Sequence, residues 1–199
     1  ECLHDGYQCV FISPHPMGLI IIQALYFFLP SYIGNGIPVL LARFKFCKEW
    51  NTPIDFNYRW GKQTIFGETK TWRGLIGCIV GGIKIAFLQY LAYIFLPSIH
   101  FLYLFPYTFP SVLWLGFLLG LGEGLGDLIK SFIKRRLNRI SSTPFFPFDQ
   151  MSFLGSLLLS CIFFPLPQSH IIAILIISPL IPVVANIVAY WLGWKKVWW

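Results

Sequence analysis

Charged residues are scarce in this chain: they make up 12% of its 199 residues, whereas hydrophobic residues make up 56%. A soluble domain usually carries about 25% charged residues. The mean hydropathy is +0.67, so the surplus of apolar surface must face lipid, and a water-soluble globular domain is excluded. The apolar runs are continuous rather than alternating, which argues against a β-barrel.

The continuous apolar runs define the expected fold. A membrane-spanning helix needs roughly 20 mostly apolar residues. Candidate spans lie at residues 17–33, 75–96, 105–121, 151–164 and 169–192. We therefore predict an all-α, polytopic integral membrane protein with about five transmembrane helices and two long cytoplasmic loops. No separate soluble domain fits into the rest, so residues 17–199 are predicted to form one membrane-embedded domain.

Lysine and arginine are missing from three segments, at 1–16, 97–104 and 165–170. Fourteen of the fifteen basic residues lie in the other connections or at the end of the chain: Arg43, Lys45, Lys48, Arg59, Lys62, Lys70, Arg73, Lys130, Lys134, Arg135, Arg136, Arg139, Lys195 and Lys196. The positive-inside rule then places the N-terminus outside and the C-terminus inside. We predict a multi-pass protein of the cell (inner) membrane, with an extracytoplasmic segment at 1–16 and the active site on the cytoplasmic face.

The first run also lacks the marks of a signal peptide. No basic flank precedes it and no A-x-A-like cleavage site follows it, so we expect a retained helix. The five cysteines show no paired metal-binding spacing. All four histidines, His4, His15, His100 and His170, fall on the predicted outer side. A Ser-His-Asp or Cys-His mechanism is therefore not favoured.

The most polar segment between the hydrophobic runs is Gly-Asp-Leu-Ile-Lys-Ser-Phe-Ile-Lys-Arg-Arg, at residues 126–136. Taken as a helix at about 100° per residue, it separates into a polar face and an apolar face. The polar face collects Asp127, Lys130, Ser131, Lys134 and Arg135. Basic residues alone would also suit topology and lipid headgroups. A carboxylate interleaved with them favours a site for a magnesium-bound polyphosphate.

The carboxylates near this helix are Glu123, Asp127 and Asp149. Mg²⁺ generally takes one or two protein carboxylates and completes its shell with phosphate oxygens and water. We predict that Asp127 and Asp149 are the metal ligands. The cations expected to neutralise the phosphates are Lys70, Arg73, Lys134 and Arg135. Backbone amides at 71–74, where the second span begins, are also placed to meet an anion. Lys84, near the middle of that span, is left without a role.

Several motifs, in order along the chain, resemble those of CDP-archaeol synthases. They are Pro-Val-Leu at 38–40, Pro-Ile-Asp-Phe at 53–56, Ile-Phe-Gly-Glu-Thr-Lys-Thr-Trp-Arg-Gly at 65–74, Gly-Asp through Ser-Phe-Ile-Lys-Arg-Arg at 126–136, Pro-Phe-Asp-Gln at 147–150 and Ala-Asn-Ile-Val-Ala-Tyr-Trp-Leu-Gly at 185–193. The resemblance covers nearly the whole chain from about residue 17. It implies five transmembrane helices and a magnesium-dependent CTP:lipid-phosphate cytidylyltransferase, related to the bacterial enzymes that make CDP-diacylglycerol.

The resemblance also implies roles for individual residues. The Gly-Asp…Ser…Lys-Arg motif carries Asp127, Ser131, Lys134 and Arg135, and the Asp-Gln motif carries Asp149. The first-loop motif carries Lys70, Thr71, Trp72 and Arg73. One departure concerns a pattern that usually reads Asp-Gln-x-Asp, because here Ser152 takes the place of the second, metal-associated aspartate. Asn138 replaces a glycine, and both residue types tolerate turn conformations.

We therefore predict in-line attack by a lipid phosphate oxygen on the α-phosphorus of CTP, without a covalent enzyme intermediate. The predicted catalytic residues are Asp127, Lys134, Arg135 and Asp149, with Asp127 and Asp149 holding Mg²⁺. The predicted CTP- and phosphate-binding residues are Lys70, Thr71, Trp72, Arg73 and Ser131. The expected partners are CTP, a membrane lipid phosphate and the bilayer, with no nucleic acid. Assembly into a homo-oligomer stays open.

Two alternative hypotheses are a lipid transporter and a non-catalytic membrane scaffold. A lipid transporter would need polar residues through the membrane midplane and often repeated halves. Lys84 and Gln89 are its only support, and no repeat is visible. A non-catalytic membrane scaffold is suggested by Ser152 alone. The lipid acceptor is left open among ether, ester and isoprenoid lipid phosphates, because the apolar residues that would line its tails are generic.

Overall fold

The computed structural model describes residues 16–41, 51–61, 63–139, 145, 148–191 and 193. Residues 1–15 of the predicted N-terminal segment lie outside this range. In chain order the elements are α1 (Met17–Leu41), β1 (Arg59–Trp60), β2 (Gln63–Thr64), α3 (Trp72–Phe95), η1 (Pro97–Leu102), α4 (Phe109–Arg136), η2 (Phe148–Gln150), α5 (Phe153–Phe163), α6 (Gln168–Ile177) and α7 (Leu180–Trp191).

The helices confirm an all-α, polytopic membrane protein. Within the described residues, four stretches are helical, long and apolar enough to cross a membrane: Met17–Pro38, Trp72–Phe95, Phe109–Arg136 and Gln168–Val188. Each apolar run predicted from the sequence is helical over most of its length. The fourth run forms only α5, whose 11 residues rise about 17 Å against a hydrocarbon core of about 30 Å. That helix therefore reaches through only part of the bilayer.

Helix boundaries differ from the expected ones at proline and glycine positions. The first helix extends beyond its predicted end at residue 33, because α1 continues through Pro30 and Pro38 to Leu41. Membrane helices tolerate proline where neighbouring groups satisfy the freed backbone. The third run and the polar segment after it form one uninterrupted helix, α4. The last run is divided into α6 and α7 by a turn at 178–179, where Pro179 has no N–H to donate.

Helix α4 lies at the centre of the bundle and packs against α1, α3 and α5. Its glycines allow close approach on two sides. A Cβ atom at Gly116 would collide with α3, and one at Gly126 would collide with the carbonyl oxygen of Ser152, just before α5. Small residues at such contacts let membrane helices pack backbone to backbone. The contact at Gly126 fixes the start of α5 beside the polar part of α4.

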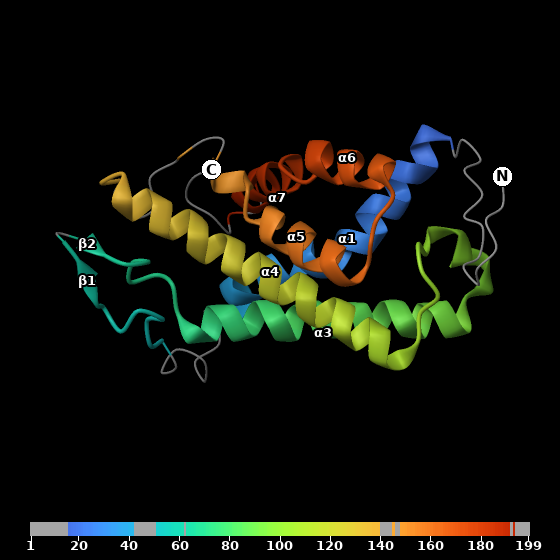
Figure 1. The fold of residues 1–199 in the computed structure, drawn as a ribbon, viewed down its shortest axis with the longest axis horizontal. Coiled ribbons are helices and arrows are strands. Elements are labelled where there is room, and N and C mark those ends of the chain that lie inside the picture. Colours follow the sequence, from blue (N-terminus) through green and yellow to red (C-terminus); the bar gives the residue numbers. More distant parts are fainter. Residues whose placement is uncertain are drawn as a thin grey trace.

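The two ends of the bundle carry different kinds of residues (Figure 1). The antiparallel hairpin of β1 and β2 lies at the same end as the C-terminus of α4, and η1 lies at the opposite end. The basic side chains of Lys70 and of the last turns of α4 are therefore gathered at the hairpin end. Lys84 is exposed on α3, so it faces away from the packed core.

Candidate functional site

The polar half of α4 contributes most of the predicted site. Asp127, Lys130 and Lys134 lie three or four residues apart in the helix, so their side chains share one face. The helix ends with Lys134, Arg135 and Arg136, and cations in the last turn are stabilised by the helix macrodipole. The amphipathic helix predicted for this segment is confirmed.

Asp127 is held between two lysines. Lys70, from the loop before α3, donates from Nζ to Asp127 Oδ2, while Lys130 Nζ lies 3.0 Å from Oδ1. The side chains of Lys70, Asp127 and Lys130 are 23%, 30% and 18% exposed. Because these ion pairs are partly shielded from water, their attraction is stronger than that of a surface pair. Two ammonium groups face one carboxylate, which leaves an excess of positive charge.

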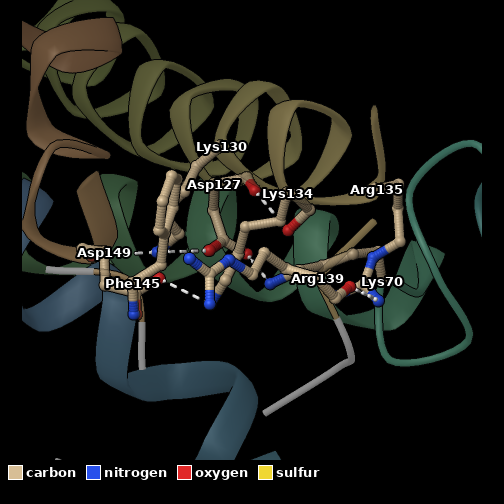
Figure 2. Close-up of polar contacts among 9 residues, drawn as sticks. Lys70, Asp127, Lys130, Lys134, Arg135, Arg139, Phe145 and Asp149 are labelled. Carbon is tan, nitrogen blue, oxygen red and sulfur yellow. Dashed lines mark hydrogen bonds and ion pairs between the residues drawn. The ribbon is translucent and has the colours of Figure 1, made fainter. Parts of the chain in front are cut away.

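Asp149 is the second carboxylate of the cluster. Lys134 Nζ donates to its Oδ1 at 2.8 Å, and the backbone amide of Phe145 donates to its Oδ2 at 2.7 Å. Lys130 Nζ also donates to the Asp149 carbonyl oxygen at 3.0 Å, so this lysine joins the two aspartates. Figure 2 shows these side chains converging from α4, from the loop before α3 and from the segment before α5. The structure therefore brings together Lys70, Asp127, Lys134 and Asp149 as predicted.

A buried aspartate organises the loop that delivers Lys70. Asp55 is 8% exposed, and its carboxylate accepts hydrogen bonds from the amides of Asn57, Phe66 and Gly67 at 3.0, 2.8 and 3.3 Å. The amide of Ile54 also donates to the Lys70 carbonyl at 2.8 Å. A carboxylate that accepts several backbone hydrogen bonds stabilises a tight loop. Asp55 thus fixes the position of the chain on both sides of the hairpin.

Arg136 ties the hairpin to α4. Its Nη1 donates to the Trp60 carbonyl at 2.7 Å and its Nη2 to the Thr64 carbonyl at 3.0 Å. Its guanidinium carbon lies 5.4 Å from the ring centres of both Trp60 and Phe132, which is within cation–π range. The last turn of α4 therefore supports the loop as well as providing charge.

The residues predicted at the start of α3 bond to neighbouring backbone groups and side chains rather than to the two aspartates. Thr71 is the N-cap of α3, where its Oγ1 accepts from Gly74 N at 3.2 Å. Because the Trp72 amide also donates to the Thr52 carbonyl at 3.1 Å, two of the amides expected to meet an anion are already engaged. Arg73 Nη2 donates to Asn51 Oδ1 at 3.0 Å.

Ser131 and Trp72 complete the predicted set. Ser131 is 4% exposed, and its hydroxyl donates to the Asp127 carbonyl at 2.8 Å. This bond to the carbonyl of the preceding turn satisfies the hydroxyl inside α4 itself. Trp72, the first residue of α3, is 38% exposed.

Arg135 borders a small polar pocket rather than joining an aspartate. The pocket has a volume of about 250 Å³ and is lined by Thr64, Gly67, Glu68, Thr69 and Arg135. The Nε atom of Arg135 is buried and makes no hydrogen bond with any described residue, while its Nη1 donates to the Arg139 carbonyl at 2.8 Å. A buried donor without an acceptor is costly, so this pocket suits an anionic or carbonyl-bearing ligand.

An apolar groove adjoins the charged cluster on the other side. It has a volume of about 290 Å³ and runs between α4 and α5. Its lining consists of Gly126, Ile129, Lys130, Ile133, Phe148, Met151, Leu154, Gly155 and Leu158. Among these residues only Lys130 is charged, and Lys130 also contacts both aspartates. The groove and the charged cluster therefore meet at one side chain.

Three residues with clear positions in the site had no predicted role. Lys130 lies on the predicted polar face, and its spacing of three residues from Asp127 was a usable signal. Asp55 belongs to a quoted motif, and carboxylates in turns often accept backbone hydrogen bonds. The contacts of Arg136 reach 72 and 76 residues back along the chain, and no local pattern indicates them.

Comparisons of the sequence with known proteins agree on one family. A family model described as CarS-like, CDP-archaeol synthase, matches residues 17–199. A CDP-archaeol synthase of Pyrococcus horikoshii is 39% identical over 186 residues, which cover 90% of this chain and 97% of that protein. A CDP-archaeol synthase of Methanococcus maripaludis is 39% identical over 191 residues, covering 91% of this chain and 98% of that protein.

A solved structure gives the same answer for the fold. It belongs to an intramembrane enzyme for archaeal membrane lipid biosynthesis and aligns with a TM-score of 0.65 at 25% sequence identity. The alignment covers 84% of this chain and 94% of the other. The helical fold is thus shared with a membrane-embedded enzyme.

Proposed function

The chain belongs to the CDP-archaeol synthase family, and from this premise we propose that it transfers CMP from CTP to a membrane lipid phosphate. The products are a CDP-lipid and pyrophosphate. The protein is then a nucleotidyltransferase of phospholipid biosynthesis, built as a multi-pass membrane protein. The names of its relatives favour an archaeal-type ether lipid as the acceptor. Residues 17–199 would act as one membrane-embedded domain.

One observation carries this proposal: a charged cluster with more lysines than carboxylates meets an apolar groove at Lys130. A CTP:lipid-phosphate transferase must hold a highly charged nucleotide next to a lipid with apolar chains. The cluster meets the first need and the groove meets the second. Their junction is the place where an acceptor phosphate and the α-phosphate of CTP would come together.

The lysines are suited to a triphosphate because each is already positioned by a carboxylate. Lys70 and Lys130 are held by Asp127, and Lys134 is held by Asp149. Phosphoryl and nucleotidyl transfer depends mainly on positioning and on neutralising negative charge, with little covalent chemistry by the protein. Preorganised cations lose little conformational entropy when phosphate oxygens replace the carboxylates as their partners. Arg135 would add a further donor from the neighbouring polar pocket.

The donor set also fits a divalent cation, and we assign this role to Mg²⁺. Asp127 and Asp149 offer carboxylate oxygens, which hard cations prefer. In the described part of the chain, no three His, Cys, Asp or Glu side chains form a metal-binding group. The two aspartates therefore suit a cation that completes its shell with phosphate oxygens. When bound, Mg²⁺ would stabilise the negative charge that develops on the pyrophosphate leaving group.

The reaction is an in-line displacement. An oxygen of the lipid phosphate attacks the α-phosphorus of CTP, and the bond between this phosphorus and the bridging oxygen to the β-phosphate breaks. Pyrophosphate takes the electron pair of that bond. Lys130 would orient the acceptor, because it lies at the polar end of the groove. Lys70, Lys134 and Arg135 would stabilise the leaving group.

The apolar groove would hold one chain of the lipid. Its lining residues come from α4 and α5 and from the segment before α5, and Gly126 and Gly155 bring the backbones of α4 and α5 into contact at its base. The backbone contact between Gly126 and Ser152 keeps the start of α5 beside the charged end of α4. We also assign this end of the bundle to the cytoplasmic face, because the basic segments gather there.

The decisive variant is Asp127→Asn. It keeps the size of the side chain but removes the charge that holds Lys70 and Lys130, so CMP transfer should fall to background. The assay uses purified protein in detergent with labelled CTP, Mg²⁺ and archaeal ether-lipid phosphate, and it measures labelled CDP-lipid.

Lys84→Gln provides the matched control, since it removes an exposed charge from a membrane helix away from the site. This variant should keep the activity of the parent protein. Both variants should elute as the same detergent-solubilised species. Full activity of Asp127→Asn would overturn the assignment of this cluster as the active site.

A further inference from the structure

Another carboxylate, that of Glu123, lies buried inside the bundle, one helical turn before Asp127. Glu123 belongs to α4 and is only 2% exposed, because α1 and the start of α5 pack around it. A carboxylate removed from water is expensive unless its charge and its hydrogen-bonding capacity are satisfied. The burial of Glu123 therefore calls for a specific partner.

The contacts of Glu123 satisfy only part of its capacity. Ser31 Oγ donates to Glu123 Oε2 at 3.0 Å. The other oxygen, Oε1, is buried and has no hydrogen bond with any described residue. The Ser152 hydroxyl is a further hydrogen-bonding neighbour of the carboxylate, and Ser156 Oγ lies 2.9 Å from Ser31 Oγ. The carboxylate thus has one oxygen free, inside a shell of oxygen atoms.

The hydroxyl hydrogens around Glu123 are too few for the contacts made. Ser31 gives its hydrogen to Glu123, and Ser156 gives its hydrogen to the Leu119 carbonyl at 2.8 Å. Each hydroxyl has one hydrogen, so the close pair of Ser31 and Ser156 oxygens has none left between them. A cluster of oxygens that lacks hydrogens attracts a positive group. That group is either a proton on Glu123 or a metal cation.

The position of Glu123 favours the cation. Residues four apart in a helix are neighbours on one face, so Glu123 lies directly behind Asp127 and the lysines that contact it. Ser152, which is 3% exposed and packs against Gly126, lies beside Glu123. Carboxylate and hydroxyl oxygens, without sulfur or imidazole, form a ligand set for a hard cation.

We propose that Glu123 is a metal ligand in this chain and that it supplies, from α4, the carboxylate that Ser152 lacks at the start of α5. The cation is divalent and hard, such as Mg²⁺ or Mn²⁺, and it lies between Glu123 and Asp127. The proposal deepens the proposed function, because it names a residue that completes the metal site of the same reaction. It also explains why a protein with serine at position 152 buries a glutamate next to that serine.

Mn²⁺ binding tests this assignment without relying on turnover. The free Mn²⁺ signal in electron paramagnetic resonance is titrated with the purified full-length chain in detergent. Glu123→Gln keeps the shape of the side chain and its contact with Ser31, yet weakens ligation, so the dissociation constant for Mn²⁺ should rise about tenfold or more. The melting temperature without metal should stay close to that of the parent protein.

A double variant moves the carboxylate back to α5. Glu123→Gln combined with Ser152→Asp should restore Mn²⁺ affinity to within a few-fold of the parent protein, whereas Glu123→Gln combined with Ser160→Asp should not. Ser160 is buried on the same helix, two turns further along, which makes it the matched position. If Glu123 had only a structural role, neither aspartate would restore Mn²⁺ binding. Restoration in the double variant with Ser152→Asp, but not in the one with Ser160→Asp, therefore supports metal ligation.

Unchanged Mn²⁺ affinity of Glu123→Gln would overturn the proposal and would favour a protonated glutamate, because a carboxamide mimics the protonated form. Failure of Ser152→Asp to restore binding would overturn the exchange between the two positions. CMP transfer is measured in parallel with the parent protein. Absence of transfer with normal Mn²⁺ binding would count against the proposed function and leave the metal site standing, so the two failures are distinguishable.

Discussion

Two polar clusters lie at opposite ends of the helix bundle, and they differ in charge. At the hairpin end, Asp127 and Asp149 face three lysines. At the η1 end, Gln23 donates to the Phe101 carbonyl at 2.6 Å, and its Oε1 lies 3.0 Å from His170 Nε2. Figure 1 shows α3 and α4 running between these two ends.

The difference shows how a site can be separated from a structural contact inside a membrane protein. The cluster around Gln23 joins α1, η1 and α6 by hydrogen bonds between side chains and backbone, and both Gln23 and His170 are buried. The cluster around Asp127 is 18–30% exposed and has more ammonium groups than carboxylates. Hydrogen bonds between buried partners stabilise a fold, whereas surplus charge that is partly open to solvent is available to a ligand.

In the comparison of these two clusters, the largest expected effect comes from removing a lysine of the charged cluster. Lys130→Met should lower kcat/KM for CMP transfer roughly 100-fold to 1,000-fold, the usual effect of losing one preorganised charged donor. The melting temperature should change less than the activity, because Asp127 keeps its ion pair with Lys70 when Lys130 is removed. Steady-state kinetics and thermal unfolding in detergent measure both effects.

Lys84→Met is the control for this variant, because Lys84 is an exposed lysine of α3. It should leave both kinetics and melting temperature near those of the parent protein. A Lys130→Met protein that unfolds early but is fully active would reverse the comparison between the two clusters.

The next largest effect concerns the cluster around Gln23, and it should appear in stability but not in activity. Gln23→Leu leaves the Phe101 carbonyl and His170 without their glutamine partner, which should cost about 0.5–2 kcal/mol of stability. Transfer activity per folded molecule should stay unchanged. Gln168→Leu is the control, because Gln168 is exposed at the start of α6. Equal melting temperatures of the two variants would show that the cluster adds nothing to the fold.

The smallest effect is expected from loosening the hairpin of β1 and β2, which Arg136 holds against α4 near the charged cluster. Arg136→Gln releases the Trp60 and Thr64 carbonyls and should let the hairpin move away from α4. Because that hairpin precedes the segment carrying Lys70, KM for CTP should rise several-fold, on the order of 1 kcal/mol, while kcat changes less. Arg59→Gln, in the exposed strand β1, is the control. A selective fall in kcat without any change in KM would contradict this positioning role.

Much of the helical architecture could be predicted from local sequence. The five apolar runs all became helices, and residues 126–136 formed the expected amphipathic segment. The failures concern how helices start and stop. Pro30 and Pro38 did not end α1, whereas the turn at 178–179 divided the last run. Whether a proline ends a membrane helix depends on neighbouring groups that satisfy the backbone, and these are set by packing.

The candidate site was predicted in composition but only partly in its contacts. Asp127, Lys134 and Asp149 meet as expected, and Lys70 reaches Asp127 across 57 residues of sequence. Thr71 became a helix cap and Ser131 a backbone contact. A residue type and its spacing indicate what a side chain is able to do. Which of several available partners it contacts depends on the arrangement of distant segments.

The sequence by itself determined that this protein lies in a membrane and that one end of it is basic. Both properties are sums over local residues: apolar side chains favour lipid one by one, and lysine or arginine in a loop favours one side of the bilayer. Only the tertiary structure decided that Lys130 joins two aspartates beside an apolar groove, and that Glu123 is buried next to Ser152. Those contacts depend on the close approach of α4 and α5 at Gly126, which is a property of two backbones packed together.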